Sequence, residues 1–492
     1  MSRLKTFLFN GILLTLTTLL IRAIGFGFNV YISNKIGSEA LGIFQLILTV
    51  YMFFTTLSTS GINLAVIRIV TEELALNPSI NTKKPMIKCL KFSLITGIIA
   101  ATLLFISAPF ISKIFLHNRI NHYIFYVISV SLPFISLATC FNGYFTALRK
   151  NGKNAINKVL EQFIKITSTA YLLSLFMPNG LNYACLCLVL GEAISEIASC
   201  VIAFILYIIE RRNCDYRLYS KTNYTKKILN ICLPVAFTSY IRSGLVCLKQ
   251  VLIPLRLEKF GLSCSKAMSC YGIINGMVLP VLMFPELVIN SFSGLLIPEF
   301  TYFYAKNDYS KISSSLSRIF RITLLFAIGV IGVFLFYSDS ISLFIYNNLE
   351  VSIYLKILCP LLLFMYLDSI VDSVLKGLDK QVGVMKVNIL DLFVSIFCIY
   401  FLLPIFGING YIFVIFVSEL LNSCISIFQL YRVSKFKIDF KKWIFKPFIY
   451  ILLSYFLTEL LIVNPCNEPF TFIIKILIFI GSYFLFLLLF EF

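Results

Sequence analysis

The chain has 492 residues, of which 59% are hydrophobic and 13% are charged, and it carries 42 Lys and Arg against 23 Asp and Glu. Its mean hydropathy is +0.91. Soluble globular domains are only about half apolar and roughly 25% charged, so this composition excludes them and indicates an integral membrane protein. The excess of positive charge must then be interpreted by its distribution, because it does not by itself indicate a nucleic-acid partner.

Apolar runs long enough to cross a bilayer recur along the whole chain. A hydrocarbon core about 30 Å thick takes roughly 20 residues of helix. The sequence therefore predicts an all-α polytopic membrane protein with about fourteen transmembrane helices. The first run contains Arg22 and is too long for a cleaved signal peptide, so it is expected to be retained. The crossings are predicted near 7–32, 41–66, 90–111, 123–147, 155–177, 182–208, 229–256, 268–298, 319–338, 352–375, 384–404, 409–431, 443–463 and 469–490.

The positive charges lie mostly on one side of this topology. The N-terminal end and the even-numbered loops hold 30 of the 42 Lys and Arg residues, the opposite side holds 6, and 6 lie within crossings. The positive-inside rule then predicts a multi-pass membrane protein with both termini in the cytoplasm. The 14 Cys form no CxxC pair, so neither a disulfide framework nor a metal site is predicted.

The chain also repeats itself, which predicts its organisation. Matched residues follow one another in a consistent order at shifts of 224 to 230: NKIG (34–37) with EKFG (258–261), ALRKNGKNAINKVLEQF (147–163) with GLDKQVGVMKVNILDLF (377–393), Gly180 with Gly407, Asn182 with Asn409, and Glu192 with Glu419. Two halves of six crossings each would share their orientation. They should be related by an axis along the membrane normal, with a substrate site between them near the midplane.

The repeat defines four predicted regions. These are an N-lobe at 1–208, a basic cytoplasmic linker at 209–228, a C-lobe at 229–431, and two extra helices within 432–492. The predicted fold is therefore two pseudo-symmetric six-helix lobes followed by two further helices.

Several cations fall inside crossings, where unpaired charges are costly and usually face a water-filled cavity. Arg22 lies in crossing 1, and Arg242 and Lys249 lie in crossing 7, each about one turn from position 246, which the repeat matches to Arg22. We predict that these three cations contact an anionic group of a substrate in the central cavity. Phosphate would suit the guanidinium groups well. The alternative is that each cation pairs with a local acid or snorkels, as expected of Lys475 in the last crossing.

Acidic residues also lie within crossings. Glu192 and Glu196 are one turn apart in crossing 6, and Glu419 lies in the middle of crossing 12. They are expected either to balance the cations or to carry H⁺ or Na⁺ for coupling, and no other cofactor is predicted. Glu161 and Lys165 have the spacing of an ion pair within one helix.

The stretch LSTSGINLAV (57–66) is unusually polar for a membrane crossing. Gly61 is expected to allow close approach of another helix. Asn63 is expected to face a polar cavity, with plain tight packing as the alternative. Asn275 and Glu286 make crossing 8 a candidate for a bendable helix that lines the same cavity.

Three segments carry a resemblance to a known family: TLLIRAIGFGFNVYISNKIGSEALG, LSTSGINLAVIRIVTEE after LGIFQLILTVY, and FNGYFTALRKNGKNAINKVLEQFIKI. They resemble the stage V sporulation protein B family. That family belongs to the multidrug/oligosaccharidyl-lipid/polysaccharide exporter superfamily, together with lipid II flippases and multidrug and toxin extrusion transporters. The resemblance covers nearly the whole chain. It implies a V-shaped fold of two lobes, alternating access, and handling of undecaprenyl-pyrophosphate-linked sugars for peptidoglycan of the spore cortex.

We therefore expect a flippase, not an enzyme, that moves a lipid-linked oligosaccharide of the lipid II type across the membrane. Its polyprenyl tail would stay in lipid beside crossings 13 and 14. Expected partners are this glycan lipid, membrane lipids, and proteins of cell-wall synthesis or sporulation. One alternative is a cation-coupled multidrug exporter with the same fold, whose cavity should be acidic or aromatic. Another is a membrane scaffold without transport activity, in which the intramembrane charges would be dispensable.

Overall fold

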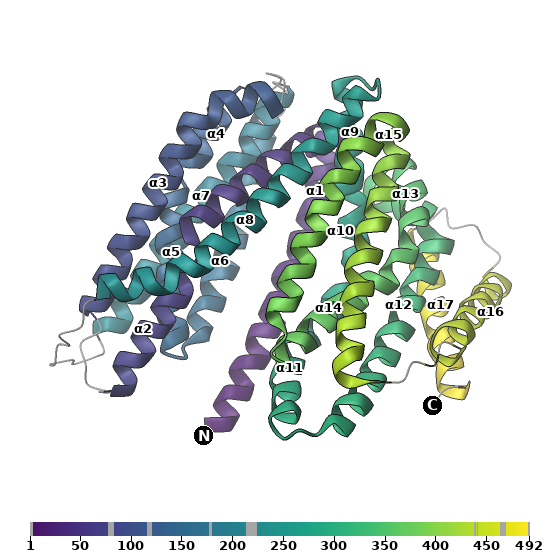
Figure 1. Ribbon diagram of the computed structural model, residues 1–492. Helices are drawn as coiled ribbons and strands as arrows, with labels where there is room; N and C mark the ends of the chain where they lie inside the picture. The colour runs from purple at the N-terminus through teal and green to yellow at the C-terminus, as the bar shows by residue number, and fades with distance from the viewer. Residues whose placement is uncertain are drawn as a thin grey trace. The chain divides into compact units, whose positions relative to one another are not determined.

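The computed structural model describes residues 3–76, 83–115, 121–176, 180–212, 224–436, 439, 441–462 and 469–490. Regular structure in these residues is helical throughout, which confirms the all-α prediction (Figure 1). The first half contains α1 (Arg3–Thr59), α2 (Ile62–Leu76), α3 (Lys83–Phe115), α4 (Tyr123–Ser129), α5 (Leu132–Ala147), α6 (Asn151–Phe176), α7 (Leu181–Arg212) and α8 (Tyr224–Lys259). The second half contains α9 (Cys264–Tyr271), α10 (Leu279–Met283), α11 (Glu286–Ala305), α12 (Tyr309–Tyr346), α13 (Glu350–Leu358), α14 (Leu362–Gly377), α15 (Gln381–Ser434), α16 (Lys446–Leu461) and α17 (Pro469–Phe490).

The chain forms two compact units. Unit 1 comprises 1–28 and 39–251, and unit 2 comprises 29–38 and 252–492. The predicted lobe boundaries stay a prediction, and residues 213–223 of the predicted linker lie outside the described residues. The core of unit 1 combines apolar residues of α2, α3, α5, α7 and α8, and the large buried ring of Tyr144 lies among them.

Eleven helical segments of the described chain are long and apolar enough to cross a membrane. Two of them, Thr17–Ala75 and Gln381–Ser434, are 59 and 54 residues long, and each includes all or most of two predicted crossings. Helix α6 is not among the eleven, because the charged residues Glu161 and Lys165 interrupt its apolar sequence. The chain is thus a multi-pass membrane protein, and the exact number of crossings stays a prediction.

The glycines that the repeat matches share an unusual backbone conformation. Gly37 and Gly261 have φ of +77° and +107°, and Gly180 and Gly407 have φ of +106° and +56°. Glycine adopts such angles without the steric penalty that other residues meet. Gly37 and Gly407 also interrupt α1 and α15, so that each of these long helices consists of two segments.

The turns that follow α5 and α14 repeat one hydrogen-bond pattern. Arg149 and Asp379, which the repeat aligns at a shift of 230, have φ of 58° and 59°. Around each of them, three successive backbone N–H groups (148–150 and 378–380) donate to carbonyls four, three and five residues earlier. The same pattern also follows α11, around Asn307 with φ of 54°, so this turn is a common way for helices of this chain to end and the repeat stays a prediction.

The chain bends at Gly61, between α1 and α2. Gly61 has φ of +79°, and a Cβ atom at this position would lie 2.7 Å from the Cα atom of Cys232 on α8. Nearby, Ser58 is fully buried, and its hydroxyl donates to the Leu132 carbonyl at 3.1 Å. The carbonyl of Ser58 in turn accepts a bond from Thr96 of α3 at 3.0 Å. Much of the polarity of this stretch therefore serves close packing of helices.

We expect Gly61→Ala to destabilise the protein strongly. A side chain at positive φ costs about 1–3 kcal/mol of backbone strain, and the clash with the backbone of Cys232 adds to that cost. Thermal unfolding of the purified protein in nanodiscs would measure the loss. Gly27→Ala is the matched control, because a Cβ at Gly27 meets nothing within 4 Å. Equal melting temperatures for the two variants would contradict the packing role of Gly61.

Candidate functional site

The three predicted substrate-binding cations all lie in unit 1. Arg22 is on α1, and Arg242 and Lys249 are on α8 within the part of that helix that belongs to this unit. Arg22 and Arg242 are exposed, whereas Lys249 is half-buried. Among the described residues, neither the Arg22 nor the Arg242 guanidinium group makes a hydrogen bond or an ion pair. Both groups are thus available to an anion.

Contacts on either side of Arg242 fix its position on the protein. The Tyr240 hydroxyl donates to the Leu57 carbonyl at 3.0 Å, and the Ser243 hydroxyl donates to Thr56 Oγ1 at 3.2 Å. Both bonds join α8 to the polar end of α1. The backbone of Arg242 is therefore held, while its side chain remains exposed.

The acids of crossing 6 form a polar network between α6 and α7. Glu192 forms an ion pair with Lys165, and Glu161 pairs with Lys158 at 2.9 Å. The hydroxyl of Ser199 also donates to Glu161 at 2.6 Å. The predicted pair of Glu161 with Lys165 within one helix is therefore wrong, because each residue has a partner elsewhere.

Glu196 lies one turn after Glu192 on α7 and is only 8% exposed. Its carboxylate interacts electrostatically with Glu161, Glu192, Lys158 and Lys165. Three carboxylates thus share two ammonium groups, and the fully ionised network has one negative charge in excess. The two lysines can therefore balance only two of the three carboxylates.

Crossing 8, predicted to be bendable, consists of several helical segments. A π-helix at Gly272–Val278 connects α9 to α10, and Pro285 stands at the start of α11. The Asn275 amide donates to the Tyr411 hydroxyl at 2.8 Å. Glu286 is 7% exposed and accepts a hydrogen bond from Asn290 at 3.1 Å. Both predicted cavity residues are thus bonded within unit 2.

Unit 2 also contains polar contacts between helices. They join the two segments of α15 to each other and join α15 to α14. Asp391 accepts hydrogen bonds from Ser418 at 2.7 Å and Ser395 at 3.4 Å. Asp368 accepts a bond from Asn422 at 2.9 Å. The only sequence signal for Asp391 was its repeat match with Glu161, which likewise accepts a bond from a serine of the following helical segment. Glu419 is half-buried on the same segment of α15 as Ser418.

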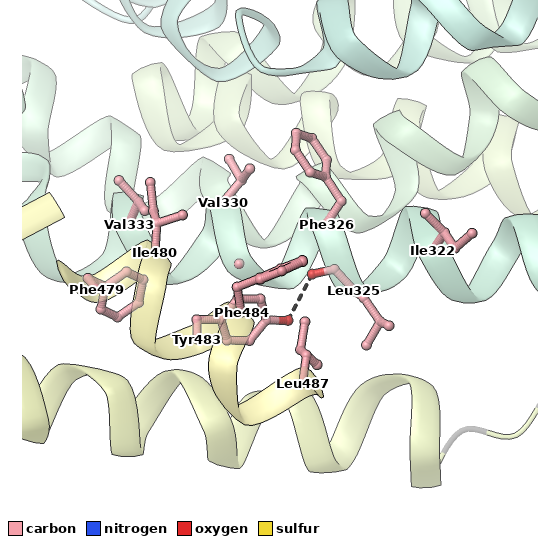
Figure 2. A pocket seen from close by; sticks show the side chains of 11 residues that line it. Ile322, Leu325, Phe326, Val330, Val333, Phe479, Ile480, Tyr483, Phe484 and Leu487 are labelled. Carbon is pink, nitrogen blue, oxygen red and sulfur yellow. Dashed lines mark hydrogen bonds between the residues drawn. The ribbon is translucent and has the colours of Figure 1, made fainter. Parts of the chain in front are cut away.

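An apolar groove of about 310 Å³ lies between α12 and α17 (Figure 2). Figure 1 shows α16 and α17, the last two helices of the chain, beside α12. Tyr483 and Leu325 both line the groove, and the Tyr483 hydroxyl donates to the Leu325 carbonyl at 2.8 Å. Its lining is hydrophobic and includes Phe326, Val330, Val333, Ile480, Phe484 and Leu487.

The prediction that Lys475 snorkels is wrong. Lys475 is 2% exposed, and its ammonium group bonds both carboxylate oxygens of Glu459 at 3.0 and 2.9 Å. Glu459 lies on α16, so the pair joins the two helices that follow the repeat. A local acid on the neighbouring helix makes it unnecessary for the lysine to reach the membrane surface.

Comparison with known proteins places the chain in a family. Residues 7–304 match the family model described as polysaccharide biosynthesis protein. The chain is 22% identical to stage V sporulation protein B of Bacillus subtilis (strain 168) over 447 residues, which cover 89% of this chain and 86% of that protein. It is 21% identical to the lipid II flippase MurJ of the same organism, over 75% of this chain and 72% of that protein.

A solved structure supports the same assignment at the level of the fold. The structure of lipid II flippase MurJ in an inward closed conformation superposes with a TM-score of 0.74 at 16% identity, over 97% of this chain and 98% of that chain. The family model spans more than half of the sequence. The chain therefore belongs to the polysaccharide biosynthesis protein family of the multidrug/oligosaccharidyl-lipid/polysaccharide exporter superfamily, as its sequence segments predicted.

Proposed function

We propose that the protein is an alternating-access flippase that moves an undecaprenyl-pyrophosphate-linked oligosaccharide of the lipid II type across the bacterial cytoplasmic membrane. Family membership supports this proposal, as does the similarity to proteins named stage V sporulation protein B and lipid II flippase. The role requires no covalent chemistry. Both termini would lie in the cytoplasm, as the distribution of positive charge predicts.

The observation that carries the proposal is that Arg22 and Arg242 lie within the membrane and keep their guanidinium groups exposed. Both belong to candidate membrane spans, and neither has a partner among the described residues. A charge in a membrane segment is costly unless it pairs or faces water. Two guanidinium groups of this kind suit a bound anion, and phosphate oxygens accept their paired N–H donors well. The pyrophosphate of the substrate would supply this anion, with Lys249 as a third contact.

The groove between α12 and α17 suits the lipid part of the same substrate. It is lined by apolar and aromatic side chains and has a volume of about 310 Å³. A polyprenyl chain has no hydrogen-bonding groups, so burial of its apolar surface would supply its binding energy. We assign the tail to this groove, in agreement with its expected place beside the last two crossings.

The acids have separate proposed roles. Because Lys165 neutralises Glu192, we assign charge balance to Glu192. Glu196 is buried beside an excess of carboxylates, and we assign to it and to Glu419 the uptake of the coupling H⁺ or Na⁺. Asn63, Asn275 and Glu286 would belong to helices that line and gate the cavity, and Gly61 would allow two of these helices to approach closely.

The exposed guanidinium groups also weigh against the two alternatives. A multidrug exporter that binds organic cations would gain nothing from two arginines without a partner among the described residues, because they would repel such substrates. A scaffold without transport activity would have no need of such charges within the membrane. The flippase accounts for both arginines.

Transport in proteoliposomes tests the proposal. The purified chain is reconstituted with fluorescent lipid II, and an impermeant quencher reports the leaflet in which the lipid lies. We expect translocation well above that of protein-free liposomes. Transport of another pyrophosphate-linked glycan, but not of lipid II, would support the flippase function with a different substrate. Export of an organic cation without movement of any glycan lipid would overturn the proposal.

A further inference from the structure

A second apolar groove lies in unit 1, on the surface formed by α3, α5 and α7, and has a volume of about 350 Å³. Its lining includes Leu90 and Leu94 of α3, Phe134 and Leu137 of α5, and Val201 and Phe204 of α7. Lys91 is the one charged residue among those that line it. The groove therefore combines a long apolar floor with a single cation.

The position of Lys91 places this cation at the edge of the membrane. Residues 92–112 follow it directly and contain no Lys, Arg, Asp or Glu. A run of about 20 such residues spans the hydrocarbon core, so Lys91 marks the level of the lipid head groups. Leu94 is nearly one turn further along α3 and lies below that level.

Two more lysines precede Lys91 on the same face of α3. Lys84, Lys88 and Lys91 have the spacing i, i+4, i+7, and all three are exposed. None of them forms a hydrogen bond or an ion pair with the described part of the chain. A row of three lysines without a partner in the described chain thus ends at a residue that lines the apolar groove.

We propose that this groove binds an anionic phospholipid of the surrounding bilayer. The lipid phosphate would contact Lys88 and Lys91, and one acyl chain would lie against Leu94, Leu137 and Val201. A phospholipid presents an anion and an apolar chain in this order and at these depths. The lysines without partners favour a lipid with net negative charge, such as phosphatidylglycerol, over zwitterionic phosphatidylcholine.

Native mass spectrometry of the full chain, titrated with phosphatidylglycerol or phosphatidylcholine, tests the proposal. We expect the intact protein to bind phosphatidylglycerol at least tenfold more tightly. The double variant Lys88→Ala, Lys91→Ala should lose this preference. Val201→Trp, which fills the groove without changing the charge, should weaken phosphatidylglycerol binding at least tenfold.

Lys386→Ala is the matched control, because Lys386 is an exposed lysine of α15 that has no partner among the described residues. It should leave lipid binding unchanged. Melting temperatures without added lipid verify that each variant is folded. Equal affinity of the intact protein for the two lipids would overturn the proposal. Loss of binding in the lysine variant with full binding in Val201→Trp would also overturn it, because the cations would then act without the groove.

Discussion

Replacement of Arg22 and Arg242 together by Ala is expected to reduce lipid II translocation to the level of protein-free liposomes. Each guanidinium would make charge-assisted hydrogen bonds to the pyrophosphate, and such bonds contribute about 1.5–3 kcal/mol each. Loss of one arginine should therefore slow transport at low substrate concentration by roughly 10- to 100-fold. The rate of fluorescent lipid II transfer in proteoliposomes measures these effects.

Both side chains are exposed and make no described contact, so their loss should leave the melting temperature nearly unchanged. Arg318→Ala is the matched control, because Arg318 is an exposed arginine of α12 that likewise lacks a described partner. Arg242→Lys keeps the charge and removes the paired donors, so an intermediate rate would show that donor geometry contributes. Transport at the full rate in the double Ala variant would refute the anion site and leave the transport function intact.

The sequence predicted the helical architecture because it depends on local signals. Long apolar runs specify membrane helices whatever their neighbours are. The matched pairs Gly37 with Gly261 and Gly180 with Gly407 all adopt positive φ. Glycines at matching positions of the two halves therefore adopt the same kind of backbone conformation.

The partners of charged residues were harder to predict, because they depend on which helix faces which. Glu161 and Lys165 have favourable spacing on one helix, but such a pair contributes only about 0.2–0.5 kcal/mol. Packing of α6 against α7 brings Glu192 to Lys165, and this contact between helices prevails over the pair within α6. Glu161 instead pairs with Lys158, three residues earlier on α6, and accepts a bond from Ser199 of α7. No periodicity within α6 predicts the contacts with α7.

For the candidate site too, the sequence predicted which residues are charged but not which partners they have. A charge within an apolar run is visible in the sequence, so Arg22, Arg242 and Glu196 could be identified. Whether another residue of the protein pairs with such a charge depends on the tertiary structure. The structure separates exposed Arg22 and Arg242 from Lys475, which is 2% exposed and fully paired. The first two are candidates for substrate binding, and the third is structural.

Glu459→Gln is expected to destabilise the protein by about 3 kcal/mol or more, and Lys475→Met by much less. Removing one partner of a buried ion pair leaves the other charge uncompensated, which typically costs 3–5 kcal/mol. The two partners are not equivalent here, because the Lys475 side chain is 3% exposed whereas the Glu459 side chain is 38% exposed. A solitary Glu459 can turn outward, but a solitary Lys475 remains enclosed.

The double variant Glu459→Gln, Lys475→Met should recover most of the stability lost in Glu459→Gln, since no buried charge then remains. Thermal unfolding in nanodiscs of the intact protein, the two single variants and the double variant measures this double-mutant cycle. Lys475 lies one turn before Phe479, a fully buried residue that lines the groove between α12 and α17. If the pair holds α17 in place, Glu459→Gln should also slow lipid II transport and the double variant should restore it. Equal destabilisation by Glu459→Gln and Lys475→Met would contradict the prediction that only a solitary Lys475 stays buried. Unchanged transport in Glu459→Gln would show that the ion pair is not needed to hold the groove in shape.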